Sequence, residues 1–229
     1  MKKKLFVACI SGLLLAVANG GDFRMHSKAP SKSHKGYVFG YGGIDLGARH
    51  ETEGNFDFYP PADPININYE LHNGATFGAG FGVRTDALGG FRFELDGSIA
   101  RNDVGFLTYE GFELPVDAEI RRHTAMFNIL KEIPFAHATG YFGGGVGYGW
   151  STFKGDIDTI EYDSKDEGFA WQLIAGLDFP ITERLALFTQ YRYLVMHDAT
   201  YETNFGDFRT TTTSNPASHS FLVGARVFF

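Results

Sequence analysis

The sequence has a single cysteine, few basic residues and no long apolar run beyond its N-terminal segment. Each of these shortages excludes a class of protein. One Cys among 229 residues excludes a disulfide framework within the chain. Lys and Arg total 20 against 27 Asp and Glu. This balance argues against nucleic acid as the main partner, because phosphate binding needs clustered basic side chains. Beyond the N-terminal segment, no apolar run is long enough to cross a bilayer as a helix.

Glycine and aromatic residues, in contrast, are abundant. The chain has 29 Gly and 23 Phe, and aromatic residues make up 16 % of it, whereas charged residues make up 21 %. A disordered chain would carry more charge and fewer aromatic side chains. The composition favours a single all-β domain with closely packed strands over a soluble α/β enzyme.

The N-terminus has the pattern of an export signal. Three lysines at 2–4 precede the apolar stretch 5–17, and a small-x-small site ends at Ala18. We therefore predict that residues 1–18 are a cleaved signal peptide. An uncleaved membrane anchor fits less well because the apolar stretch is short. Lipoprotein processing at Cys9 fits less well because the apolar run continues past it.

Residues 19–36 are basic, contain Ser, Gly and Pro, and lack apolar periodicity, so we expect a flexible periplasmic linker. Over 37–229, apolar residues alternate with polar or small ones, and a period of two predicts strands. In 169–179, for example, the odd positions are apolar or aromatic, and Gln172 and Asp178 lie on the opposite face. Eight such segments are expected, near 37–49, 73–85, 90–103, 119–133, 140–153, 168–179, 185–198 and 218–229.

The connections between these segments alternate between long and short. The long ones are expected near 50–72, 104–118, 154–167 and 199–217. This pattern predicts an eight-stranded antiparallel up-and-down transmembrane β-barrel, which closes because a strand in hydrocarbon must pair every N–H and C=O group. A secreted soluble barrel would show the same alternation, with its apolar face inside the barrel and its polar face outside. The export signal, the aromatic residues near strand ends and the charges opposite the apolar face favour the membrane.

The run 168–193, which ends in Tyr-Arg-Tyr, resembles the last two-strand hairpin of the opacity-type porin family. Members of this family are small outer-membrane barrels, similar in architecture to the transmembrane domain of outer membrane protein A. Residues 91–97 resemble the family's third strand and 219–229 its closing strand. Residues 128–134 resemble a strand end, with Lys131 in place of the usual aromatic residue.

The resemblance covers about 37–229 and implies a barrel in a Gram-negative outer membrane, with both termini in the periplasm. It also implies insertion by the barrel-assembly machinery after escort by periplasmic chaperones. In such barrels the terminal aromatic residue and the alternating apolar residues before it form the recognition segment. Here those residues are Phe221, Val223, Ala225, Val227 and Phe229.

Charged residues fall on the face opposite the apolar one, and we expect them in the lumen. They are Arg84, Arg92, Glu94, Asp96, Arg122, Asp178, Arg192 and Arg226. The lumen of an eight-stranded barrel is just wide enough for side chains to fill. Unpaired buried charges are costly, so these groups are expected to pair into a plug that fixes the barrel. A narrow ion path is the alternative.

The histidines and serines near the strand ends bear on two further kinds of site, a metal site and a catalytic pair. His197 and His219 flank the last long connection and would suit a metal if they met, but no spacing supports this, so no metal is predicted. A lipid A-modifying enzyme on such a barrel needs a Ser paired with a His on one face. In Ser218-His219-Ser220 the neighbours point to opposite faces, so we predict no catalytic residue and no cofactor.

The long connections are rich in Asp and Glu, which predicts a solvated anionic surface. Such a surface suits a basic ligand or bridging by divalent cations, although the acids at 156–166 lack the spacing of an EF-hand. The expected role is therefore structural or surface-interacting and adhesion-like. The expected surroundings are outer-membrane lipid and lipopolysaccharide, and a host or surface ligand would bind through the loops. A diffusion channel and a lipid A-modifying enzyme remain alternatives.

Overall fold

The computed structural model describes most of the chain from Lys35 to Phe229. The described residues are 35–46, 49–56, 65–71, 73–85, 90–109, 112–157, 160–197, 199–205, 208–214 and 217–229. Side chains are described for 35–46, 73–85, 90–103, 119–152, 167–197 and 217–229. The predicted signal peptide and nearly all of the predicted linker lie outside these residues. Within the described part, no helix has the length and apolarity needed to cross a membrane.

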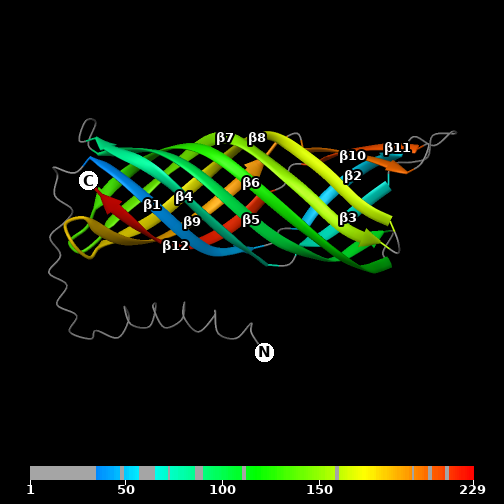
Figure 1. Cartoon of the computed structure of the whole chain (residues 1–229), viewed down its shortest axis with the longest axis horizontal. Helices are drawn as coiled ribbons and strands as arrows, with labels where there is room; N and C mark the ends of the chain where they lie inside the picture. The colour runs from blue at the N-terminus through cyan, green and yellow to red at the C-terminus, as the bar shows by residue number, and fades with distance from the viewer. Residues whose placement is uncertain are drawn as a thin grey trace, which may run out of the picture.

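Eight strands form a closed antiparallel ring (Figure 1). Each strand pairs with the next, and the first pairs with the last, so that no edge remains in the ring. This confirms the predicted eight-stranded up-and-down barrel. The strands are β1 (Gly36–Leu46), β4 (Gly74–Thr85), β5 (Phe91–Tyr109), β6 (Phe112–Pro134), β7 (Thr139–Ile157), β8 (Ile160–Pro180), β9 (Leu185–Met196) and β12 (Ala217–Phe228).

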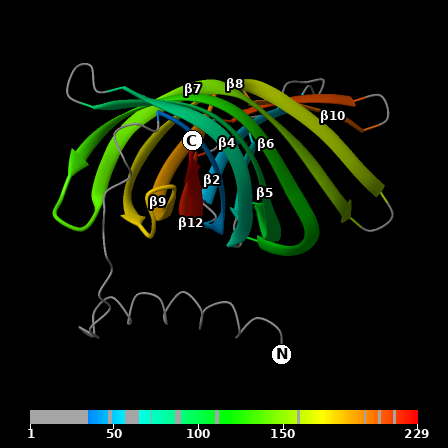
Figure 2. The same cartoon turned by 60° about the vertical axis from the view of Figure 1, so that its left-hand side comes forward.

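Four shorter strands extend the sheet beyond the ring. They are β2 (Arg49–Phe56), β3 (Ile65–Leu71), β10 (Ala199–Phe205) and β11 (Phe208–Ser214). They lie at the end of the barrel away from the C-terminus, and we call this the loop end (Figures 1 and 2). The end that holds the C-terminus is called the terminal end.

The expectation that 50–72, 104–118, 154–167 and 199–217 only connect strands was wrong for much of their length. β5 and β6 continue through most of 104–118, β7 and β8 through most of 154–167, and the other two connections contain hairpins. The physical reason is that a paired ladder satisfies backbone N–H and C=O groups beyond the membrane as well as within it. A charged side chain does not end a strand that has one face in water.

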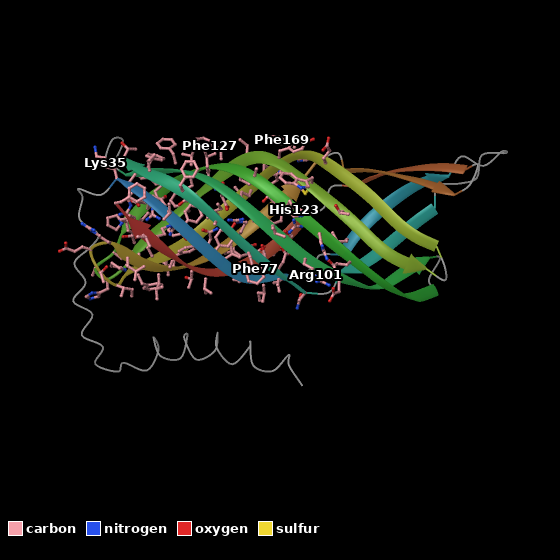
Figure 3. The ribbon with its side chains drawn as sticks, viewed as in Figure 1. Lys35, Phe77, Arg101, His123, Phe127 and Phe169 are labelled. Carbon is pink, nitrogen blue, oxygen red and sulfur yellow. The ribbon has the colours of Figure 1, made fainter. Side chains whose placement is uncertain are left out.

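The two faces of each strand differ sharply in exposure. On β12, Phe221 and Val227 are 51 % and 47 % exposed. Leu222, Arg226 and Phe228, which alternate with them, are 2 %, 0 % and 1 % exposed. Apolar side chains thus cover the outside while charged ones lie inside, which is the reverse of a soluble barrel. Figure 3 labels three outward phenylalanines, Phe77, Phe127 and Phe169.

The aromatic residues of β1 face the lumen and not lipid. On β1, Tyr37, Phe39 and Tyr41 are buried inside the barrel. They lie against inward glycines of the neighbouring β4: a Cβ placed at Gly80 or Gly82 would be 2.5 Å from a ring carbon of Phe39 or Tyr37. Glycine on β4 therefore makes the room that the aromatic rings of β1 fill.

Candidate functional site, the charged interior of the barrel

The interior charges gather in three levels along the barrel, and the largest set lies at the terminal end. Arg92 and Arg226, both fully buried, share Asp178. The Arg92 Nη2 to Asp178 Oδ2 distance is 2.5 Å, and Arg226 Nη1 donates to Oδ1. Glu94 is the second acid here, because its Oε1 accepts from Arg226 Nη2 at 3.3 Å and from the Tyr37 hydroxyl at 2.7 Å.

Glu132 completes this level from β6. Its Oε1 accepts from Arg84 Nε at 2.8 Å and from Arg92 Nε. We call the whole set the terminal cluster. It contains three arginines and three carboxylates: Arg84, Arg92, Arg226, Glu94, Glu132 and Asp178. Its formal charge is therefore zero.

Aromatic rings line the guanidinium groups of the terminal cluster. The Arg226 guanidinium carbon lies 4.1 Å from the ring centre of Phe188 and 4.7 Å from that of Tyr141. Arg92 lies 4.9 Å from the Tyr141 ring centre. A cation above a ring face is attracted by the ring quadrupole, and burial strengthens the attraction. The rings thus fill the space that the charges leave and help to hold the arginines in place.

The middle level is smaller and closed on itself. Arg192 Nη2 donates to Asp96 Oδ2 at 2.5 Å, and its Nη1 donates to the Tyr41 hydroxyl at 2.9 Å. That hydroxyl donates to Asp96 Oδ1 at 2.7 Å. We call these three residues the middle cluster. Nearby, Gln172 Nε2 donates to Asn128 Oδ1 at 2.6 Å. One arginine and one carboxylate again sum to zero.

The third level lies toward the loop end and is built around Asp45 of β1. Arg122 Nη2 donates to Asp45 Oδ2 at 2.7 Å and to Ser218 Oγ at 2.8 Å. Ser220 Oγ donates to the same carboxylate oxygen at 3.1 Å, and Asn102 Nδ2 to the other at 3.5 Å. We call this set the loop-end cluster. It too pairs one positive charge with one negative charge.

The structure places all eight of the predicted lumen residues inside the barrel and brings them into these three clusters. Sequence reasoning missed two acids, Asp45 and Glu132. With them, five arginines meet five carboxylates rather than three. Glu132 could have been found, because it has the same parity as Arg122 on one strand. Asp45 shares its parity with the aromatic residues of β1, which the apolar-outside rule assigns to lipid.

The histidines and serines near the strand ends have different partners in the structure. Ser218 and Ser220 are buried inside, whereas His219 faces outward with its Nδ1 2.7 Å from the Tyr191 hydroxyl. These residues therefore cannot act as a serine and its histidine base. His197 instead accepts from Trp171 Nε1 at 3.0 Å. Among the described residues, no group of three or more His, Cys, Asp or Glu is placed to hold a metal.

The predicted recognition segment occupies the outward positions of β12 and the last residue of the chain. The Phe229 side chain is exposed, and its N–H donates to Gly36 O at 2.9 Å. The outward side chains are Phe221, Val223, Ala225, Val227 and Phe229. Their place at the seam between β1 and β12 is thus defined, and their role in assembly stays a prediction.

A closed barrel with an apolar outside, a charged inside and hairpins at one end is the architecture of outer-membrane barrels. Residues 39–227 match the family model described as the outer membrane protein beta-barrel domain. The chain belongs to this family. The match confirms the kind of barrel that the resemblance to the opacity-type porins implied, and it places the protein in the outer membrane.

Two solved structures show how widely the fold is shared. Outer membrane protein OprG from Pseudomonas aeruginosa is similar with a TM-score of 0.59 and 15 % identity, over 86 % of this chain and 97 % of that one. Outer membrane protein AlkL, solved in lipid bilayers, has a TM-score of 0.51 and 17 % identity, over 90 % and 97 %. These likenesses show the fold alone. No curated protein matches the sequence significantly.

Proposed function

We propose that the protein is a structural, surface-interacting barrel whose lumen is closed by its own side chains. The observation that carries this proposal is that three clusters, each with a formal charge of zero, follow one another along the interior of the barrel. Arg92 and Arg226 are fully buried, and Glu94, Asp96, Asp178 and Arg192 are nearly so. A passing ion would have to separate these pairs, and breaking a buried ion pair costs about 3–5 kcal/mol.

The orientation follows from the connections. Short turns lie at the terminal end and hairpins at the loop end, and outer-membrane barrels have short periplasmic turns and longer outer loops. We therefore place both termini in the periplasm. Residues 1–18 would be removed on export, and 19–36 would link the barrel to the cleavage site. Assembly would use the periplasmic chaperones and the barrel-assembly machinery, with the segment that ends at Phe229 as the recognition signal.

The hairpins at the loop end would carry the interaction surface. Their sequences are acidic, with four aspartates and two glutamates between residues 156 and 167. A surface of this charge attracts basic ligands and can be bridged to other anionic surfaces by divalent cations. A basic segment on a host or neighbouring cell fits this chemistry, and nucleic acid does not.

A narrow diffusion channel is the second candidate, and one observation favours it. Six buried polar side-chain atoms make no hydrogen bond within the described part of the chain. They are Arg92 Nη1, Asn128 Nδ2, Ser151 Oγ, Gln172 Oε1, Arg192 Nε and Arg226 Nε. Buried polar groups are normally satisfied by protein or by ordered water. A hydrated path along these atoms would therefore support slow conduction.

A lipid A-modifying enzyme is the third candidate and has the least support. The opposite orientation of His219 and its two serine neighbours removes the pair that such chemistry needs. Mass spectrometry of lipid A from cells with and without the protein tests this alternative. An acyl chain that is lost or gained only when His219 is intact would establish an enzyme.

The experiment that tests the proposal uses one detergent-folded sample of the chain without residues 1–18. Its migration in SDS is compared before and after boiling, and its conductance is measured in a planar bilayer. A closed barrel is expected to shift on boiling and to carry no current. A shift together with stable conductance would favour the channel. Solubility without detergent and no shift would contradict the membrane barrel altogether.

A further inference from the structure

The apolar stripe on the outside of β5 and β6 ends at a pair of arginines. Arg101 is the next outward residue after Ile99 (Figure 3). Arg121 is the outward residue beyond His123 toward the loop end. The two arginines are direct partners in the β5–β6 ladder. Their side chains are 60 % and 54 % exposed. They thus differ from the interior arginines, which are buried or nearly so.

A single carboxylate holds this pair together. Glu119 accepts from Arg101 Nη2 at one oxygen and from Arg121 Nε at the other. Two guanidinium groups on one carboxylate leave a net charge of +1 on these three residues. Asp103, which is exposed and lies opposite Glu119 in the ladder, brings the formal charge of the four residues to zero, so the distinctive feature here is the exposed pair of guanidinium groups and not a surplus of positive charge. Each guanidinium has five N–H donors, so the shared carboxylate uses few of them.

The arginine pair lies at the polar edge of the apolar band. Ile99 and Trp150, on the membrane side of the pair, are exposed to lipid. His123 stacks on Trp150 with ring centres 5.6 Å apart and planes at 6°. Tryptophan is typical of the level where hydrocarbon meets headgroups. Because outward residues follow each other by about 7 Å along a strand, Arg101 and Arg121 reach the headgroup layer.

The corresponding edge is built differently on the strands around β9 and β12. There the lipid face carries Tyr191, Tyr193 and His219, and the His219 ring contacts both tyrosine rings. Aromatic rings at this level serve as a general membrane anchor. Among the side chains that the structure describes at this level, the paired guanidinium groups of β5 and β6 thus have no counterpart on β9 and β12.

We propose that Arg101 and Arg121 bind a phosphate group of lipid A, with Glu119 fixing the two guanidinium groups side by side. A planar guanidinium matches a phosphate with two parallel hydrogen bonds, so two adjacent ones present a fork for each side of the anion. The assignment to lipid A rests on the proposed orientation, in which the loop end faces the outer leaflet. It does not depend on whether the lumen conducts.

The test compares lipid binding by the folded chain without residues 1–18 and by its variants, using native mass spectrometry. The probes are lipid A with both phosphates, lipid A without phosphates, and phosphatidylglycerol. Arg101→Gln and Arg121→Gln should each weaken binding of phosphorylated lipid A about fivefold, and both together about 25-fold. A basic residue near an anionic membrane surface contributes about 1 kcal/mol, which corresponds to these factors. Dephosphorylated lipid A should bind the wild type as weakly as phosphorylated lipid A binds the double variant.

Arg184→Gln is the matched control. Arg184 is exposed in the turn between β8 and β9 at the terminal end, and its loss should change lipid A binding less than twofold. Every variant must first show the heat-dependent shift of a folded barrel. If the double variant binds lipid A like the wild type, the proposal is overturned. Equal affinity of the wild type for phosphatidylglycerol would overturn the assignment to lipid A.

Discussion

Arg226 and Val227 are neighbours on β12 and face two different environments. Arg226 is fully buried among two carboxylates and four aromatic rings, whereas Val227 is 47 % exposed on the lipid face. The interior accepts charged side chains because the formal charges of each cluster sum to zero. It limits the size of the side chains because the aromatic rings fill the space left by glycines. The lipid face accepts large apolar side chains and excludes charge until the headgroup level. The following variants test that contrast, and each has a counterpart on the other face or at a neutral position.

The largest effect is expected from Asp178→Ala. Its loss leaves two fully buried guanidinium groups, those of Arg92 and Arg226, without their shared carboxylate. The free energy of unfolding in lipid vesicles, measured by urea titration, should fall by about 3–5 kcal/mol. The exposed Asp103 provides the control, and Asp103→Ala should change stability by about 0.5 kcal/mol or less. Equal effects of the two changes would contradict the structural role of the interior charges.

A charge placed on the lipid face should cost nearly as much. Leu95 faces outward from β5 and is 46 % exposed. Leu95→Arg should lower the free energy of unfolding by about 2–4 kcal/mol, as for a basic residue near the bilayer midplane. Leu95→Met should cost less than about 1.5 kcal/mol. A well-tolerated arginine at this position would show that this face does not contact hydrocarbon.

A smaller effect is expected from adding one methyl group to an interior glycine. An alanine Cβ at Gly80 would lie 2.5 Å from the Phe39 ring and even closer to a backbone oxygen of β5. Gly80→Ala should therefore destabilise the barrel by about 1–3 kcal/mol. At the outward Gly97 the nearest atom to a new Cβ is 3.9 Å away. Gly97→Ala should be neutral or slightly stabilising, and thermal unfolding of both variants would show whether the asymmetry exists.

The smallest effect concerns single hydroxyl groups. Tyr37→Phe removes the donor to Glu94, a hydrogen bond of 2.7 Å inside the barrel. A hydrogen bond to a charged group contributes about 1.5–3 kcal/mol, so the loss should lie near the lower limit. Tyr191→Phe removes a bond of the same length to His219 on the outside, and a neutral bond contributes about 1 kcal/mol. The urea midpoint should therefore fall further for Tyr37→Phe than for Tyr191→Phe. A larger fall for Tyr191→Phe would contradict the stronger contribution of the interior hydrogen bond.

Alternation of residue types predicted most of this architecture. The period of two identified eight strands, and the charges opposite the apolar face identified the lumen side of β4, β5, β6, β8, β9 and β12. The prediction that the apolar face points outward needed the export signal as well as the alternation, since neither alone distinguishes a membrane barrel from a soluble one. The fold could be predicted because a one-residue slip would move every apolar side chain to the wrong face.

The rest depended on contacts between strands, which one sequence does not encode. Tyr37, Phe39 and Tyr41 face inward because glycines on β4 leave room for their rings and arginines from other strands lie against them. Because the aromatic face of β1 points inward, Asp45 on the same face was not predicted as a lumen residue. The hairpins at the loop end were predicted as loops because their acidic sequences suggest a solvated surface, whereas pairing between neighbouring strands continues there.

A double-mutant cycle at Asp178 and Arg226 tests the central claim most directly. The claim is that the interior charges form neutral, coupled sets rather than independent groups along a hydrated path. Removing both residues takes away one charge of each sign and leaves the terminal cluster neutral. The double change to alanine should therefore cost less than the sum of the two single changes, with a coupling energy of about 2 kcal/mol or more in urea unfolding. Additive costs would contradict the account and favour a hydrated lumen.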